Sequence, residues 1–184
     1  LKVTHSVANR EYYDWKRECL GVFVTSSGSP VSRKGGGLGK ANDTITFTTA
    51  EQYAPLMEVA NRWYEPQTVG PRLKRVHRPD LDAIGVLGLA VWYQDDGSRW
   101  VAKSKFMGCE FATHGFVPAD VELLVTWLRD RWGFTSACAV RVGHKGRLRI
   151  RLRVADTLKL WRLLRPYIHP SQCRKVTLPE GYEL

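Results

Sequence analysis

The feature that most constrains the fold is a strict alternation of side chains at residues 147–154. Arginine fills every second position and an aliphatic residue fills each position between, in the order Arg147-Leu-Arg-Ile-Arg-Leu-Arg-Val154. Successive side chains of a β-strand point to opposite faces of a sheet. The stretch therefore predicts a strand with one cationic face and one apolar face.

We refer to the cationic row as the arginine comb; it consists of Arg147, Arg149, Arg151 and Arg153. Alternate residues lie roughly 6.6 Å apart along a strand, so the comb is a straight row of charges. Gly143-His-Lys-Gly146 predicts a hairpin turn that carries Lys145, and the partner strand is expected to add Arg141. A two-stranded ribbon fits the major groove of DNA, where arginine and lysine reach guanine edges or phosphates. A charged edge strand that only prevents aggregation is the alternative, but four arginines with no interleaved acid exceed that need.

A second constraint is the apolar stretch at residues 84–97, which ends abruptly in Asp95-Asp96-Gly97. Four of its residues recur at helical spacing and are expected to share one helix face: Gly85, Leu89, Trp92 and Asp96. Gly97 predicts the helix end, since glycine readily adopts the left-handed conformation found there. A helix with a carboxylate at its tip can hold a metal ion. A buried core helix followed by an Asp-Gly turn is the alternative.

A shorter alternation at residues 44–49 predicts another two-faced strand. Its polar face consists of Thr44, Thr46 and Thr48, and its apolar face of Ile45 and Phe47. The preceding Ser- and Gly-rich loop at residues 26–40 carries three cations: Arg33, Lys34 and Lys40. We expect this threonine face to be a weaker counterpart of the arginine comb, with the loop cations contributing to nucleic-acid binding.

The order of predicted elements occurs twice, which indicates an internal duplication. Val3-Thr-His-Ser6 resembles Ala112-Thr-His-Gly115, and Thr49-Ala-Glu51 resembles Val154-Ala-Asp156. We therefore predict an α+β fold with two related halves, residues 1–80 and residues 81–184. The acid-tipped helix precedes the strands of the second half, so a first such helix is expected upstream of Leu1. It would lie in an N-terminal extension of at least about 25 residues.

Composition narrows the class of partner. The chain has 184 residues, with 28 Lys and Arg against 18 Asp and Glu, and its formal charge of +10 indicates a polyanionic partner. Apolar residues make up 43% of the chain, which argues against wholesale disorder. The sequence lacks an apolar run of about 18 residues, so no membrane span is expected. The cysteines are scattered without CxxC spacing, which favours reduced thiols of an intracellular protein over a disulfide framework or zinc site.

The nonapeptide Leu89-Ala-Val-Trp-Tyr-Gln-Asp-Asp-Gly97 resembles the signature of LAGLIDADG homing endonucleases. It is most similar to the sub-group whose signature is roughly Leu-Ala-x-Trp-(Tyr/Phe)-Met-Asp-Asp-Gly. The similarity continues in family order through residues 111–116, residues 121–125 and Arg165-Pro-Tyr-Ile-His-Pro170. The resemblance implies two pseudo-symmetric αββαββα halves. In such proteins the motif helices pack at the centre, and antiparallel sheets form a saddle over DNA.

The resemblance also implies a function. Such proteins are site-specific double-strand DNA endonucleases of mobile introns or inteins, and they hydrolyse phosphodiesters with a divalent cation, usually Mg²⁺. Asp96 matches the acid that binds the metal. Lys175 matches the basic residue near the chemistry in the second half, and Lys74 is the match for the first. Their implied role is to stabilise the phosphorane or orient water; positioning a phosphate is the alternative for Lys175.

Two departures from the family pattern matter. Gln94 stands where the family name has its first acid, although the sub-group has methionine there. The first motif is absent from residues 1–80, and one helix cannot present two symmetric carboxylates. We expect a pseudo-symmetric monomer that obtains its first acidic helix from an upstream segment or a partner chain. The alternative is a catalytically inactive relative, such as an intron RNA maturase or RNA-associated structural protein, whose comb grips structured RNA.

Overall fold

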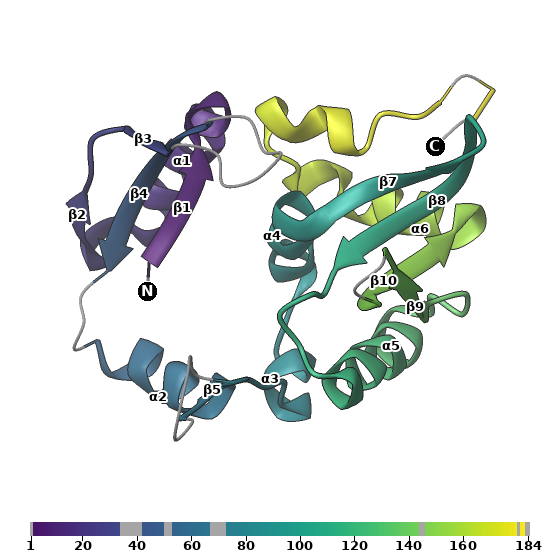
Figure 1. Ribbon diagram of the computed structural model, residues 1–184, viewed down its shortest axis with the longest axis horizontal. Helices are drawn as coiled ribbons and strands as arrows, with labels where there is room; N and C mark the ends of the chain where they lie inside the picture. Colours follow the sequence, from purple (N-terminus) through teal and green to yellow (C-terminus); the bar gives the residue numbers. More distant parts are fainter. Residues whose placement is uncertain are drawn as a thin grey trace. The chain divides into compact units, whose positions relative to one another are not determined.

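The computed structural model describes residues 2–33, 42–49, 53–66, 73–143, 146–179 and 181–182. The chain forms two compact units that divide between Asn61 and Arg62. Each unit has its own antiparallel sheet (Figure 1). Each unit also has its own apolar core. Within the described residues, no helix is long and apolar enough to cross a membrane.

The first unit is a sheet packed against one helix. Its elements are β1 (Lys2–Ser6), η1 (Val7–Asn9), α1 (Arg10–Leu20), η2 (Gly21–Phe23), β2 (Val24–Ser27), β3 (Val31–Arg33), β4 (Asn42–Thr49) and α2 (Ala54–Trp63), which runs across the division. The strand order is β1-β4-β2, with β3 also paired to β4. α1 packs on β1 and β4, and Tyr13, Ile45 and Phe47 form the buried core between them. The predicted two-faced strand at residues 44–49 is confirmed.

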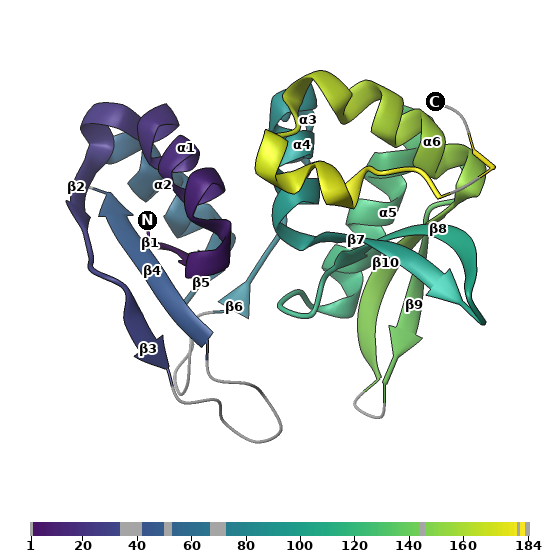
Figure 2. The same ribbon diagram turned by 90° about the horizontal axis from the view of Figure 1, so that it is seen from above.

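The second unit is a four-stranded sheet covered by helices. Its elements are β5 (Tyr64–Glu65), β6 (Leu73–Lys74), α3 (Arg78–Asp82), α4 (Val86–Asp96), β7 (Gly97–Ala102), β8 (Lys105–Ala112), α5 (Pro118–Trp132), β9 (Cys138–Val142), β10 (Arg147–Arg153), α6 (Val154–Leu164), η3 (Arg165–Tyr167) and η4 (Pro170–Lys175). The strand order is β7-β8-β10-β9, and every pairing is antiparallel. Helices α5 and α6 pack against this sheet (Figure 2). Their core includes Phe111, Trp127, Ile150, Leu152 and Trp161, each without exposed surface.

Three strands of each sheet share an order. The order β1-β4-β2 in the first unit repeats β8-β10-β9 in the second, and a helix follows β1 as α5 follows β8. This agrees with the predicted α+β fold and its repeated element order. The register revises one proposed match. When Thr49 is aligned to Val154, Thr46 is equivalent to Arg151. Thr4 lies opposite Thr46, and Glu110 lies opposite Arg151. The residue equivalent to Thr4 is therefore Glu110. The division into halves at residues 1–80 and 81–184 stays a prediction.

The predicted acid-tipped helix is α4, but two details differ from expectation. Its buried residues are Leu89, Ala90, Tyr93 and Gln94, so only Leu89 of the expected face is fully buried. Gly97 is not left-handed, since its φ of −80° and ψ of 148° are those of extended backbone. Glycine is required there by space instead. A Cβ at Gly97 would lie 2.3 Å from Cδ2 of the Tyr93 ring and 2.4 Å from the Tyr93 carbonyl oxygen.

Candidate nucleic-acid interface and active site

The register of β10 confirms that the arginine comb and the core residues occupy opposite faces. Ile150 and Leu152 are fully buried against the helices, whereas Arg147 and Arg153 are exposed. Arg149 lies opposite Ala112 of β8 and Val140 of β9, which places the comb in the interior of the sheet rather than on an edge strand. An interior strand needs no edge protection, so that alternative explanation of the arginines does not apply.

Arg141 does not belong to the comb. It pairs with Leu148 across the hairpin, and paired residues of an antiparallel sheet project to the same face. Its side chain therefore leaves the sheet on the side opposite Arg149. Its Nη1 donates a 3.1 Å hydrogen bond to the Gly146 carbonyl oxygen in the turn. The prediction that Arg141 extends the cationic face was wrong, because the register of β9 and β10 pairs Arg141 with Leu148 rather than with an arginine of the comb. Lys145, in the same turn, lies outside the described residues.

An acid lies among the comb arginines, contrary to expectation. Glu110 of β8 is adjacent to β10, and its side chain is only 9% exposed. Its carboxylate forms ion pairs with Arg149 Nη1 and with Arg151 Nε, the latter at 3.1 Å. Sequence reasoning missed Glu110 because the acid comes from the neighbouring strand, 39 residues before Arg149.

Two further side chains extend this cluster across the sheet. Arg149 Nε donates a 3.3 Å hydrogen bond to His114 Nε2, and the Arg151 guanidinium lies 4.3 Å from the centroid of the Trp100 ring. We name Trp100, Arg151, Glu110, Arg149 and His114 the Glu110 cluster. Its members come from β7, β8, β10 and the loop after β8. The resulting outward surface is basic, aromatic and partly fixed in place.

The corresponding face of the first unit carries hydroxyl groups. Thr4 Oγ1 and Thr46 Oγ1 lie 2.8 Å apart, and Thr44 Oγ1 donates to the Val31 carbonyl oxygen at 3.4 Å. Thr48 is hydrogen-bonded to Ser26. The predicted polar face of Thr44, Thr46 and Thr48 is thus present. Lys34, Lys40 and the side chain of Arg33 lie outside the described residues.

Asp96 is the last residue of α4, and its side chain is exposed. It lines a cavity of about 220 Å³ within the second unit, and Lys74 of β6 lines the same cavity. Lys74 Nζ lies 4.5 Å from the centroid of the Phe116 ring, which fixes its position by a cation–π contact. The remaining lining residues are Trp63, Leu81, Ile84, Gly88, Trp92, Phe116 and Leu124. The structure therefore brings two of the three predicted catalytic residues to one cavity.

Lys175 reaches the same end of α4 from the C-terminal segment. Its Nζ donates to the carbonyl oxygens of Gln94 at 2.6 Å, Asp95 at 3.3 Å and Gly97 at 2.9 Å. The last carbonyls of a helix lack partners within the helix and carry partial negative charge. The Lys175 ammonium thus caps the turn from which Asp96 projects.

Gln94 fastens the C-terminal segment to α4. Its Nε2 donates to the carbonyl oxygens of Ala90 and Tyr167, both at 3.2 Å, and its Oε1 accepts from the His169 amide at 2.7 Å. The Tyr93 hydroxyl adds a 3.2 Å hydrogen bond to the Lys175 carbonyl oxygen and accepts from the Trp161 indole at 2.9 Å. Burial raises the pKa of Tyr93, so this hydroxyl keeps its proton. An amide, rather than a family acid, serves here because the site needs a donor as well as an acceptor.

The donor set at Asp96 suits a hard divalent cation. Mg²⁺ is held through one or two carboxylates together with substrate phosphates rather than by an all-protein cage. An exposed carboxylate at the end of α4 meets that requirement. Among the described residues, no cluster of three or more His, Cys, Asp or Glu side chains offers a cage for a metal ion.

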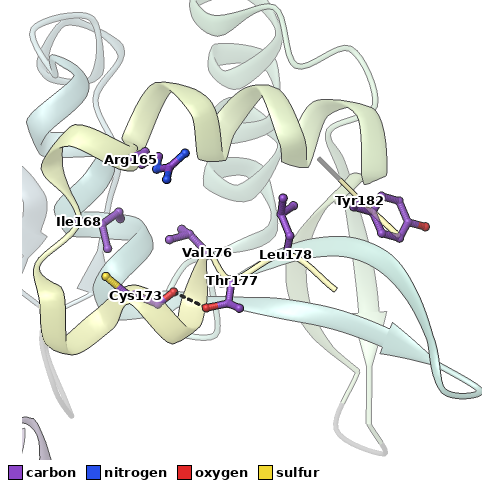
Figure 3. Close-up of a pocket in the computed structure, with 7 residues that line it drawn as sticks. All are labelled: Arg165, Ile168, Cys173, Val176, Thr177, Leu178 and Tyr182. Carbon is purple, nitrogen blue, oxygen red and sulfur yellow. Dashed lines mark hydrogen bonds between the residues drawn. The ribbon is translucent and has the colours of Figure 1, made fainter. Parts of the chain in front are cut away.

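A separate cavity of about 630 Å³ lies beneath the C-terminal segment, between α6 and η4 (Figure 3). It is lined by Arg165, Ile168, Cys173, Val176, Thr177, Leu178 and Tyr182. Thr177 Oγ1 donates a 2.9 Å hydrogen bond to the Cys173 carbonyl oxygen at one wall. None of the predicted site residues lines it.

Comparison with protein families decides the classification. The profile described as the LAGLIDADG DNA endonuclease family matches residues 1–160. The chain belongs to the LAGLIDADG DNA endonuclease family. The expectation drawn from the nonapeptide at residues 89–97 is confirmed.

Curated relatives of this LAGLIDADG chain are longer than the chain itself. It is 30% identical over 107 residues to "Probable intron-encoded endonuclease 1" of Wickerhamomyces canadensis, covering 56% of this chain and 45% of that protein. It is 28% identical over 186 residues to "Protein RecA" of Mycobacterium gastri, covering 96% of this chain and 40% of that protein. The chain thus spans less than half the length of these relatives.

Solved LAGLIDADG structures share the fold. The homing endonuclease I-WcaI bound to its DNA recognition sequence matches with a TM-score of 0.76 and 21% identity, over 97% of this chain and 75% of that chain. The N-terminal LAGLIDADG domain of DUF199/WhiA matches with a TM-score of 0.51 and 11% identity, over 96% of this chain and 76% of that chain. These matches confirm the predicted α+β LAGLIDADG architecture.

Proposed function

We propose that this chain is a site-specific DNA endonuclease that binds double-stranded DNA and hydrolyses its phosphodiesters with Mg²⁺ held at Asp96. The observation that carries the proposal is the exposed Asp96 at the end of α4, in a chain whose family match spans residues 1–160. The outward comb of β10 supplies the cationic surface that a DNA partner needs. Similarity to a homing endonuclease bound to its DNA recognition sequence supports the same partner.

Each predicted catalytic residue has a role that follows from its geometry. Asp96 would hold the cation, which when bound polarises a phosphoryl oxygen and lowers the pKa of an attacking water. Lys175 donates hydrogen bonds to three backbone carbonyl oxygens at the end of α4, those of Gln94, Asp95 and Gly97. Lys175 therefore shapes the turn that presents Asp96. Lys74, at the same cavity as Asp96, supplies positive charge near the scissile phosphate.

Cutting both DNA strands requires two such carboxylates, and α4 supplies one. We place α4 in the second LAGLIDADG half, residues 81–184, and propose that a second acid-tipped helix comes from an upstream segment or a partner chain. Apart from this second helix, we propose that the protein binds its DNA site as a pseudo-symmetric monomer. The four cysteines are free thiols, which fits a reducing compartment inside the cell.

A plasmid assay tests the proposal. The substrate plasmid carries the two sequences that flank the reading frame of this chain, joined directly to each other. This junction is the sequence that an uninterrupted host gene would have. Supercoiled plasmid should become relaxed or linear only when Mg²⁺ is present, and chelation with EDTA should stop the reaction. Asp96→Asn should abolish cleavage, whereas Asp95→Asn, the adjacent exposed acid, should retain it.

Two results would contradict the proposal. Cleavage by Asp96→Asn at the wild-type rate would remove Asp96 from the chemistry. The absence of cleavage by wild type, together with tighter binding to a structured RNA than to duplex DNA, would favour the inactive RNA-binding alternative.

A further inference from the structure

We propose that Glu110 divides the arginine comb into two inner arginines, Arg149 and Arg151, that read base edges, and two outer arginines, Arg147 and Arg153, that neutralise phosphates. Glu110 itself is a positioning residue, which acts on DNA through the two guanidiniums. This inference rests on the proposed binding of double-stranded DNA. It adds to that proposal the means by which the second unit selects a sequence.

The first step is the placement of Glu110. It lies on β8, an interior strand, between Ser98 of β7 and Arg151 of β10. Its side chain is 9% exposed on the outward face of the sheet, and its two oxygens are paired with two different arginines. A carboxylate so far removed from water is stable only when both oxygens are satisfied. The inner arginines are therefore held in place before any DNA arrives.

The second step is that each inner guanidinium is also held from its other side. Arg149 donates from Nε to His114, and Arg151 lies over the face of Trp100. The side chains of Arg149 and Arg151 are 33% and 24% exposed, so each still presents part of its guanidinium outward. Arginine has five N–H donors, and these contacts leave some for a ligand.

The third step concerns the chemistry of recognition. A guanidinium fixed in one plane loses little side-chain entropy on binding, and its paired donors match the O6 and N7 acceptors of guanine. Because Glu110 offsets part of their charge, the inner arginines attract phosphates less than unpaired arginines do. They are thus suited to reading bases.

The outer arginines differ from the inner arginines in their exposure and in their pairing with acids. Arg147 and Arg153 are exposed, and no acid of the described residues forms an ion pair with either side chain. An exposed flexible arginine neutralises a phosphate without selecting a base, and it releases counterions when it does so. The comb therefore combines two functions on one strand.

Spacing gives the inference a sharper form. Arg149 and Arg151 lie two residues apart on β10, about 6.6 Å along the strand. Bases of one DNA strand are spaced about 3.4 Å apart along the helix axis. With the strand lying along the groove, the inner arginines would select two guanines about two base steps apart.

The test is selection of duplexes from a pool with a randomised segment, using the 184-residue chain at fixed salt. Wild type should enrich the guanine pair. Glu110→Asp keeps the charge but shortens the side chain by one methylene, so it cannot reach both guanidiniums. It should lower the ratio of affinities for the selected and the scrambled duplex about tenfold. The dependence of its affinity on salt should equal that of wild type.

Other variants separate charge from position. Arg147→Gln should keep the preferred bases and reduce the slope of log affinity against log salt by about 0.9. Glu110→Gln should lose base preference, and it should steepen the slope measured on the scrambled duplex. Glu122→Gln is the matched control, because Glu122 is an exposed acid of α5 and the charge change is the same. It should leave both measurements as in wild type.

Circular dichroism melts of each variant establish that the chain is folded at the assay temperature. The inference is overturned if folded Glu110→Asp retains the wild-type affinity ratio. It is also overturned if Glu110→Asp still selects both guanines but no longer selects a cytosine that wild type selects. That result would mean that Glu110 contacts a base itself. If wild type enriches no sequence, both the inference and the proposed DNA function are overturned. The first two outcomes overturn the inference but leave DNA binding intact.

Discussion

The Lys175 ammonium lies 2.6 Å from the carbonyl oxygen of Gln94, the residue whose side chain ties the C-terminal segment to α4. The two residues therefore hold each other. Gln94 fixes the backbone at Tyr167 and His169, and Lys175, a few residues later, caps the helix to which Gln94 belongs. The end of α4 that carries Asp96 is shaped by a segment some 80 residues away.

Removing the cap should loosen this end of the helix. Lys175→Met retains most of the aliphatic length but leaves three carbonyl oxygens without their donor. We expect a loss of about 1–3 kcal/mol of unfolding free energy, the usual range for hydrogen bonds to charged groups. Urea denaturation followed by circular dichroism measures it. Arg174→Met, at the exposed neighbouring position, is the control and should change stability little. Equal stability of the two variants would contradict the capping role.

Gln94 offers a direct comparison of an amide with the residues found elsewhere in the family. Gln94→Met fits the buried space but loses the hydrogen bonds to Tyr167 and His169. Gln94→Glu can still accept from His169 but cannot donate to Tyr167. Both should speed hydrogen exchange in residues 167–175, and Gln94→Glu should be less stable than Gln94→Met because it buries a charge beside carbonyl oxygens. Unchanged exchange in this segment would show that the tether is unimportant.

The glycines that flank α4 should respond differently to a methyl group. Gly97→Ala would place a Cβ against Tyr93, and we expect a loss of roughly 1–3 kcal/mol from overpacking. Gly85→Ala meets no atom within 4 Å, so it should change stability by a few tenths of a kcal/mol. Thermal melts of both variants test the pair. Equal effects would mean that the structure accommodates a Cβ at position 97, which would contradict the spatial requirement for Gly97.

Asp156 should make stability depend on acid pH. Burial raises the pKa of this carboxyl, but hydrogen bonds from the Ser136 hydroxyl and amide and from Lys159 outweigh it, so the pKa is below its usual range. A lowered pKa means that the contribution is complete above the unfolded pKa, about 3.9, and is lost as the pH falls through the folded value. Ser136→Ala should therefore lower the melting temperature at pH 7, and the difference from wild type should shrink towards pH 2. A difference that is constant with pH would contradict this role.

The cysteines should divide by reactivity. Cys109 is buried, and burial raises the pKa of its thiol to about 12, whereas Cys19, Cys138 and Cys173 are exposed. Reaction with a thiol reagent at pH 8 should modify three cysteines in the folded chain and four in denaturant. Cys109→Ala should not change the folded count.

Local patterns predicted much of this molecule. Alternation identified β4 and β10 because each has one buried face, and the stretch at residues 84–97 identified α4 and its terminal acid. Register could not be predicted in the same way, since it depends on which strands are neighbours. For that reason Arg141 was assigned to the wrong face and Glu110 was missed. The tether at Gln94 was equally hidden, because its partners come from a distant segment. A polar residue at a position where the sub-group has methionine was the one available signal.

Three strands of each sheet share an order, β1-β4-β2 and β8-β10-β9, but the two faces offer different chemistry to a partner. A threonine hydroxyl both donates and accepts, so it can find a partner on any base edge, whereas a clamped guanidinium can only donate. If the protein recognises DNA as proposed, the part of the target that faces the threonines could change in sequence and still be recognised. The part that faces the arginine comb could not. Host lineages would then accumulate neutral changes on one side of the target faster than on the other, and an alignment of target alleles would carry that asymmetry.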